Sequence, residues 1–227
     1  MAVVSGVGRR TVLAALIGAV PLALAGCGGD VDGGARPGTS TAPPPTGAAG
    51  ADTTVMIIRH GEKPGGGEPG RDEDGTRDKK SLTARGWRRA RALPGLFVAA
   101  PGRPAAPLPR PATLFAAADT GPHAGAHRMR QTVAPLAAAV HERVDVSIAE
   151  GQESRLAAAA LSAPGPVLIC WEHSRIPAIV RALGAADAPG VPADWPDRFD
   201  LVWVFTRHAG SWTFREVRQH LLEGDAA

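Results

Sequence analysis

The chain has 227 residues, enough for one globular domain with a sizeable hydrophobic core. Hydrophobic residues make up 44% and charged residues 21% of the chain, which excludes an intrinsically disordered protein. The formal net charge is +3, but Arg9 and Arg10 lie in a segment that we expect to be removed, and without them 23 basic side chains face 22 acidic ones. The charge balance therefore gives no reason to expect a nucleic-acid partner.

The first 27 residues are predicted to form a secretory signal sequence. Arg9-Arg10 precedes an apolar run of 15 residues, Thr11 to Ala25, which is shorter than the roughly 20 that a membrane-spanning helix needs. Leu24-Ala25-Gly26-Cys27 resembles a bacterial lipoprotein box. This implies lipidation of Cys27 and export to the outer face of the bacterial cell membrane. An ordinary signal peptide with an incidental cysteine is the alternative, and the general and twin-arginine export routes both stay open.

Residues 28–52 consist almost wholly of Gly, Pro, Ala, Ser and Thr with scattered Asp, and they cannot bury an apolar face. We therefore expect a flexible linker over 28–52 and a folded domain over 53–227. The second cysteine, Cys170, lies in an apolar run and is expected to be a packing residue.

Within the domain, short apolar runs alternate with helical patterns. This alternation predicts a three-layer α/β/α sandwich with a largely parallel sheet. Strands are expected at Val55–Ile58, Thr113–Ala116, Val144–Ile148 and Val167–Trp171, followed by a hairpin of Leu201–Thr206 and Trp212–Val217. Helices are expected at Leu82–Leu93 with Ser81 as N-cap, and at His127–His141, Gln152–Leu161 and Ile176–Leu183.

Two of the predicted strands end in a histidine. Val55–Ile58 leads into Arg59-His60-Gly61-Glu62, and Val167–Trp171 leads into Glu172-His173. Ligands bind at the carboxyl ends of parallel strands, so adjacent strands here would bring both imidazoles to one sheet edge. Gly61 permits a sharp turn, and Arg59 offers a planar set of donors suited to phosphate.

A third candidate group opens the helix that follows. Arg128 and Thr132 are four residues apart, hence on one helix face, next to an apolar stripe that begins at Met129. The start of a helix also favours an anion through its free N–H groups. Arg128 is therefore a candidate phosphate ligand.

The chain from about Thr54 to Val217 resembles the histidine phosphatase superfamily, the phosphoglycerate-mutase-like clan. The resemblance rests on Arg59-His60-Gly61-Glu62, on Leu82-Thr83-x-x-Gly86-x-x-x-Ala90, on Arg128-x-x-x-Thr132 and on the strand ending at His173. It implies a phosphoglycerate-mutase-like fold, with His60 as the phosphorylated nucleophile and Arg59, Arg128 and His173 around the transferring group. Imidazole can attack phosphorus near neutral pH without a metal, so no metal and no cofactor are expected.

The resemblance leaves the proton donor to the leaving group open. In many relatives it is a glutamate between the arginine helix and the second histidine, which makes Glu150 the first choice and Glu153 the second. The second histidine of the family usually follows glycine, whereas Glu172 stands here. Strand alternation would turn the side chain of Glu172 away from the pocket, although it could raise the proton affinity of His173.

Three other features are weaker. His123 and His127 have a spacing seen in metal sites, but no further ligands complete one. Arginines on the first helix lack the stacking aromatics of a nucleic-acid surface, and we expect a solvated face there (Arg85, Arg88, Arg89 and Arg91). The long segment 61–80 is expected to be either a substrate lid or a disordered flap.

We therefore expect a phosphohydrolase acting on a phosphomonoester or a related phosphorylated compound outside the cytoplasm. Its partners would be a small phosphorylated substrate and a membrane held through Cys27, with no nucleic acid, and the oligomeric state is open. The alternative is a catalytically silent lipoprotein that binds anionic ligands through Arg59 and Arg128.

Overall fold

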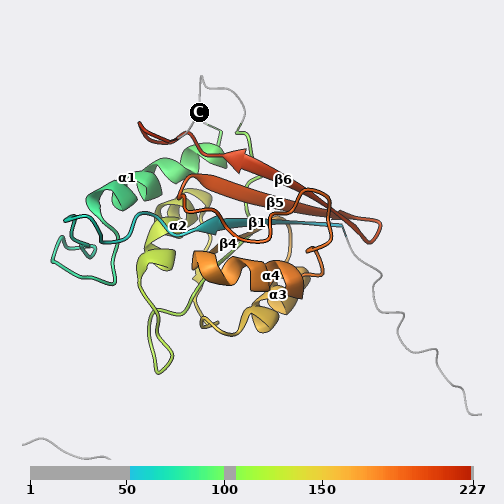
Figure 1. The fold of residues 1–227 in the computed structure, drawn as a ribbon, viewed down its shortest axis with the longest axis horizontal. Coiled ribbons are helices and arrows are strands. Elements are labelled where there is room, and N and C mark those ends of the chain that lie inside the picture. Colours follow the sequence, from blue (N-terminus) through green and yellow to red (C-terminus); the bar gives the residue numbers. More distant parts are fainter. Residues whose placement is uncertain (1–51, 100–105, 226–227) are drawn as a thin grey trace, which may run out of the picture. The chain divides into compact units, whose positions relative to one another are not determined.

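The structure is a computed structural model that describes residues 52–99 and 106–225 (Figure 1). The predicted signal sequence, Cys27 and nearly all of the predicted linker lie outside the described residues. A mixed sheet of six strands forms the centre, with the order β3-β2-β4-β1-β5-β6. The strands are β1 Thr53–Arg59, β2 Thr113–Ala116, β3 Val144–Asp145, β4 Val167–Trp171, β5 Leu201–His208 and β6 Ser211–Arg218.

The first four strands in the chain run parallel, and the last two add an antiparallel edge. β1 pairs with β4, β4 with β2, and β2 with β3, all in parallel register. β5 runs antiparallel to β1 and forms a hairpin with β6. The hairpin turns at Ala209 and Gly210, whose φ values of 47° and 82° suit the two-residue turn that matches strand twist.

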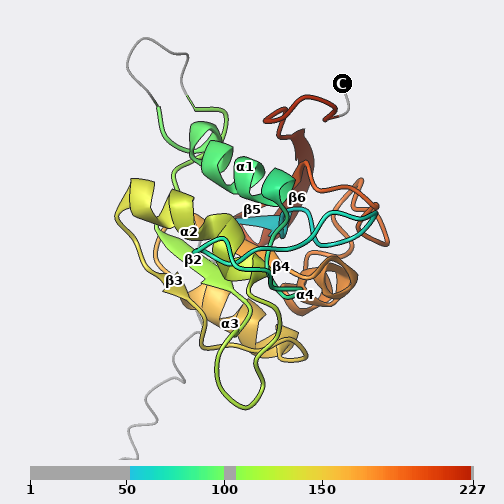
Figure 2. The same ribbon diagram turned by 90° about the vertical axis from the view of Figure 1, so that its left-hand side faces the viewer.

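Four α-helices cover the two faces of the sheet, as Figures 1 and 2 show. α1 (Ala84–Ala92) and α2 (Arg128–Val140) pack together on one face, and α3 (Glu153–Ser162) and α4 (Ile176–Ala182) pack on the other. Short 3₁₀ helices, η1 (Leu93–Leu96) and η2 (His173–Arg175), extend α1 and precede α4. This arrangement confirms the predicted three-layer α/β/α architecture.

The core explains why β1 and β4 lack polar alternation. Every residue of β4 and the residues of β1 from Val55 onward are buried, because helices lie on both sides of these central strands. The predicted stripe on α2, which runs from Met129 to Val140, is also buried against the sheet. These central elements therefore hold the ends of β1 and β4 in fixed positions.

Two predicted boundaries were wrong for local reasons. α1 starts at Ala84 with Thr83 as N-cap, because the Thr83 hydroxyl accepts from Gly86 N, and Ser81 instead bonds to Asp78 and Gln131. The strand predicted over Val144–Ile148 stops at Asp145, whose carboxylate accepts from the N–H of Ser147 and turns the chain out of the sheet.

Among residues 52–99 and 106–225, no helix is both long and apolar enough to cross a bilayer.

Candidate active site

The pairing of β1 with β4 brings the two candidate histidines to one edge of the sheet. Arg59, the last residue of β1, pairs in register with Trp171, the last residue of β4. The N–H of His60 then donates to the carbonyl of Trp171 at 3.3 Å. His60 and His173 therefore leave neighbouring strands at the same end, as the sequence predicted.

The ring of His60 is held as a neutral base. The side chain is 1% exposed, and its Nδ1 lies 2.7 Å from the carbonyl oxygen of Gly61. A carbonyl can only accept, so Nδ1 carries the proton and the lone pair is on Nε2. Burial, together with the nearby charges of Arg128 and Arg59, lowers the pKa of His60 to about 3, against the partial opposition of the Gly61 bond and Glu172.

The loop after His60 is fixed by the start of α2. The N–H of Gly61 donates to Thr132 Oγ1 at 2.8 Å, and that hydroxyl donates to the carbonyl of Arg128 at 2.7 Å. Thr132 therefore ties the nucleophile loop to the helix that carries Arg128. The Arg128-x-x-x-Thr132 spacing thus places the Thr132 hydroxyl where it can bond to both Arg128 and Gly61.

Arg59 is buried, and hydrogen bonds hold one nitrogen of its guanidinium group. Its Nη1 donates to Asp197 Oδ1 at 2.9 Å and to the carbonyl of Arg198 at 3.5 Å, and its guanidinium carbon lies 4.0 Å from the ring centroid of Phe199. Its Nε is buried without a hydrogen-bond partner. Neither Asp197 nor Phe199 was predicted, because both lie about 140 residues further along the chain and carry no motif.

Arg128 approaches His60 from the start of α2. Its Nη1 donates to the carbonyl of Lys79 at 3.2 Å, which connects it to the segment after the nucleophile. Its Nε is also buried without a partner. Burial lowers the pKa of Arg128 although Glu150, Asp78 and Glu172 favour its charge. Two guanidinium groups near His60 thus each have a buried donor available to an anion.

His173 lies beside the carboxylate of Glu172, which strand alternation predicted to point away from the pocket. Its Nδ1 is 2.6 Å from Oε1 of Glu172, a close contact in which Nδ1 has no aligned hydrogen-bond partner. Strand alternation does not apply to this pair, because β4 ends at Trp171 and the chain turns into η2 with Glu172 as its N-cap. Glu172 accepts from both the N–H and the hydroxyl of Ser174. Glu172 therefore faces the site, and its charge acts on His60.

The two candidate glutamates have different surroundings. Glu150 is half-buried, and burial and the charge of Glu172 raise its pKa, against Arg175 and Arg128. A Cβ on Gly125 would lie 2.9 Å from Glu150 Oε1, so the carboxylate lies close against the backbone of Gly125. Glu153, in contrast, accepts from Gly151 N and Trp171 Nε1 at 2.9 and 3.2 Å. Glu150 thus lies near Arg128 and is the better candidate for the proton donor, whereas Glu153 supports the end of β4.

The remaining sequence candidates have structural roles. Arg89 is 3% exposed and pairs with Glu62 and Asp225, so the expectation of a solvated arginine face was wrong at this position. His127 lies 3.1 Å from Asp119. Within the described residues, no cluster of three or more His, Cys, Asp or Glu side chains is placed to hold a metal ion. Cys170 is fully buried, and burial raises the pKa of its thiol.

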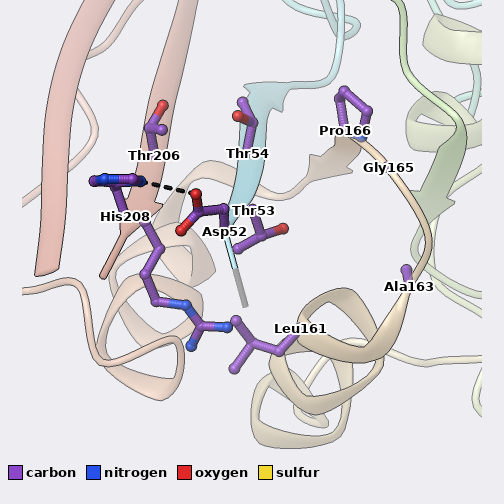
Figure 3. A pocket seen from close by; sticks show the side chains of 10 residues that line it. Asp52, Thr53, Thr54, Leu161, Ala163, Gly165, Pro166, Thr206 and His208 are labelled. Carbon is purple, nitrogen blue, oxygen red and sulfur yellow. Dashed lines mark hydrogen bonds and ion pairs between the residues drawn. The ribbon is translucent and has the colours of Figure 1, made fainter. Parts of the chain in front are cut away.

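A separate hollow lies at the opposite end of β1. Figure 3 shows it between the start of β1, the end of β5 and the loop before β4, with a hydrogen bond of 2.8 Å between His208 Nδ1 and Asp52 Oδ2. Its lining includes none of the candidate catalytic or phosphate-binding residues.

The fold and the site define an α/β protein with a buried neutral histidine between two guanidinium groups at the carboxyl edge of a mixed sheet. Among solved structures, the chain resembles one assigned as the phosphohistidine phosphatase SixA from Agrobacterium tumefaciens, with 18% identity and a TM-score of 0.47, covering 73% of this chain and 97% of that one. It also resembles the alpha-ribazole phosphatase from Shigella flexneri (14% identity, TM-score 0.47, 73% and 96% covered) and the phosphoglycerate mutase from Bacillus anthracis (11%, 0.43, 74% and 94%). No protein-family model matches the chain, and no curated protein matches it.

Proposed function

We propose that the chain is a phosphohydrolase that acts on a phosphomonoester through a phosphohistidine on His60. The observation that carries this proposal is the neutral, buried His60, whose Nδ1 is held by Gly61 and whose Nε2 keeps its lone pair. A nucleophile between two guanidinium groups with unpartnered donors suits attack on a phosphoryl group and little else.

The reaction would proceed in two steps. Nε2 of His60 attacks phosphorus and forms the P–N bond while the P–O bond to the leaving group breaks, and the protonated carboxyl of Glu150 gives that oxygen its proton. Water then attacks phosphorus and gives a proton to Glu150, the P–N bond breaks, and its electron pair returns to Nε2. Arg59, Arg128 and His173 would stabilise the equatorial oxygens throughout.

We infer that the reaction needs no metal. Two guanidinium groups supply the positive charge that a phosphoryl group requires, and a second imidazole supplies a further hydrogen-bond donor. Activity that survives dialysis against a chelator would support this inference, and activity that returns only when a divalent cation is added would contradict it.

The proposed location is the outer face of the bacterial cell membrane, with a lipid on Cys27 and a small phosphorylated substrate. The support for this is the basic pair, the short apolar run and the Leu-Ala-Gly-Cys motif of the sequence.

The test is hydrolysis of p-nitrophenyl phosphate by the purified full chain, with His60→Ala as the variant and His208→Ala as the control. His208 is an exposed histidine at the other end of the sheet. We expect His60→Ala to lose about 10³-fold or more in kcat/KM and His208→Ala to keep the native rate. Brief incubation with labelled substrate should trap acid-labile phosphate on the peptide that contains residue 60.

The alternative, a silent protein that binds anions through Arg59 and Arg128, predicts a different result. It requires phosphate binding without turnover over a broad substrate panel and pH range. The raised pKa of Glu150 and the tautomer fixed by Gly61 favour the enzyme, since binding alone requires neither.

A further inference from the structure

The guanidinium of Arg59 is held by one short segment of the chain, residues 197–199. Asp197 Oδ1 and the carbonyl of Arg198 both accept from Nη1, at 2.9 and 3.5 Å. The ring of Phe199 lies against the guanidinium plane, with 4.0 Å from its centroid to the guanidinium carbon. Three consecutive residues thus fix the end and the face of one side chain.

These contacts leave the Nε edge of the Arg59 guanidinium group available to a ligand. These contacts are to Nη1 and to the plane of the guanidinium group, while the buried Nε has no hydrogen-bond partner. An arginine binds phosphate through two parallel N–H groups, and Nε supplies one of them on the edge away from Nη1. A buried donor without a partner is costly, so an anion that accepts from Nε is the natural complement.

The position of Asp197 is unusual for a stabilising ion pair. Its side chain is 93% exposed, and exposed pairs add little to folding stability. Its charge also opposes a dianion in the site, where it adds to the negative charge of Glu172. Orienting Arg59 therefore explains an exposed carboxylate at this position better than stabilising the fold does.

We propose that Asp197 and Phe199 are positioning residues that hold Arg59 with its Nε edge turned toward the phosphoryl group. This rests on the proposed function of the site. Holding the guanidinium before substrate arrives removes part of the ordering cost of binding. The opposite possibility is that Asp197 competes with phosphate for Arg59 and must be displaced before phosphate binds.

Two substitutions of Asp197 separate these possibilities. Both Asp197→Asn and Asp197→Ala remove the charge, but only Asp197→Asn keeps an oxygen that can accept from Nη1. If Asp197 positions Arg59, inorganic phosphate should bind Asp197→Ala about 3- to 10-fold more weakly than Asp197→Asn in titration calorimetry of the full chain. Phe199→Leu, which keeps apolar volume but removes the aromatic face, should weaken phosphate binding by roughly 2- to 10-fold. Equal binding by the two Asp197 variants, whether tighter or weaker than native, overturns the proposal.

The background of Arg59→Ala provides a second check. There the difference between Asp197→Asn and Asp197→Ala should vanish, because a positioning effect requires the side chain that is positioned. A difference that persists overturns the proposal. Asp194 is an exposed aspartate three residues before Asp197, so Asp194→Ala controls for the loss of a negative charge and should bind phosphate as the native chain does.

Failure of the positioning proposal and failure of the proposed hydrolase activity give different results. Phosphate binding that depends on Arg59 but brings no turnover and no phosphohistidine contradicts the hydrolase and leaves the positioning result standing. Turnover with equal binding by the two Asp197 variants contradicts the positioning alone. A native chain that binds no phosphate overturns both.

Discussion

At the residue scale, the two histidines of the site differ in their surroundings. His60 is 1% exposed and lies near two guanidinium groups, which together keep its ring neutral, and the bond to the Gly61 carbonyl fixes its tautomer. The side chain of His173 is 28% exposed and lies beside the carboxylate of Glu172. A nucleophile requires a free lone pair, and a group that stabilises phosphoryl oxygens requires a proton to donate. The environments thus match the two different tasks that we propose for the two rings.

The low pKa of His60 predicts a contribution to acid sensitivity. In the unfolded chain the imidazole takes up a proton below about pH 6.5, whereas in the folded chain it stays neutral down to about pH 3. The unfolded state therefore binds more protons in this window, and the free energy of unfolding should fall as the pH falls. This single group contributes at most about 1.4 kcal/mol per pH unit.

The variant that tests this is His60→Asn, whose amide can still donate to Gly61 but does not titrate. Urea unfolding between pH 7 and 4 should show a shallower loss of stability in His60→Asn than in the native chain. Parallel pH profiles for the two proteins would show that His60 is not protonated differently in the two states.

Glu150 and Glu153 differ in a way that kinetics can separate. A general acid matters most for a poor leaving group, so Glu150→Gln should lower kcat by about 10²- to 10³-fold on an alkyl phosphate and by less on p-nitrophenyl phosphate. Glu153→Gln weakens the contacts to Gly151 and Trp171, and it should lower thermal stability while the ratio of the two rates stays native. Should Glu153→Gln change that ratio and Glu150→Gln leave it, the acid assignment is reversed.

At the element scale, the site depends on how closely α1 packs against the loop after His60. A Cβ on Gly86 would lie 2.7 Å from the carbonyl oxygen and 3.0 Å from the nitrogen of Glu62, which are backbone atoms. The carboxylate of Glu62 in turn accepts from Arg85 and Arg89 on the same helix. The glycine in the Leu82-Thr83-x-x-Gly86 motif therefore permits the contact that fixes the nucleophile loop.

Replacing this glycine should move the helix and the loop apart. Gly86→Ala is expected to destabilise the domain by about 1–3 kcal/mol and to lower kcat/KM, because neither backbone can yield without displacing the other. Gly95→Ala is the matched control, since a Cβ there would meet no atom within 4 Å. Urea unfolding and phosphatase rates for both variants would measure the difference. Native stability in Gly86→Ala would show that the helix shifts at no cost.

The elements that the sequence predicted best are those whose environment is uniform along their length. β2 and β4 were predicted with the observed bounds, and the stripe on α2 with the observed burial, because both follow from local apolar patterns. The early end of β3 depends on one side-chain bond of Asp145. The contacts of Asp197 and Phe199 with Arg59 depend on tertiary folding over nearly 140 residues, and no local pattern encodes them.

At the scale of the whole molecule, the chain enters the domain at the end of β1 that lies away from the site. Asp52 borders the hollow of Figure 3, whereas His60 lies beyond the last residue of the same strand. Seven strand residues separate these ends by roughly 20 Å. The predicted linker of 25 residues adds a reach of up to roughly 80 Å when extended. An anchor at Cys27 would thus leave the site accessible to soluble substrates.

This geometry predicts that anchoring and catalysis are independent. When the full chain is expressed in a bacterial host, the native protein should partition into the detergent phase of a Triton X-114 extract, and Cys27→Ser should partition into the aqueous phase, because two acyl chains are needed for stable membrane attachment. The kcat/KM of Cys27→Ser toward a soluble substrate should equal that of the native protein. Cys170→Ala, which changes the buried cysteine of β4, should stay in the detergent phase. Native protein recovered in the aqueous phase would contradict the anchor, and a lower kcat/KM in Cys27→Ser would show that the anchor acts on the site.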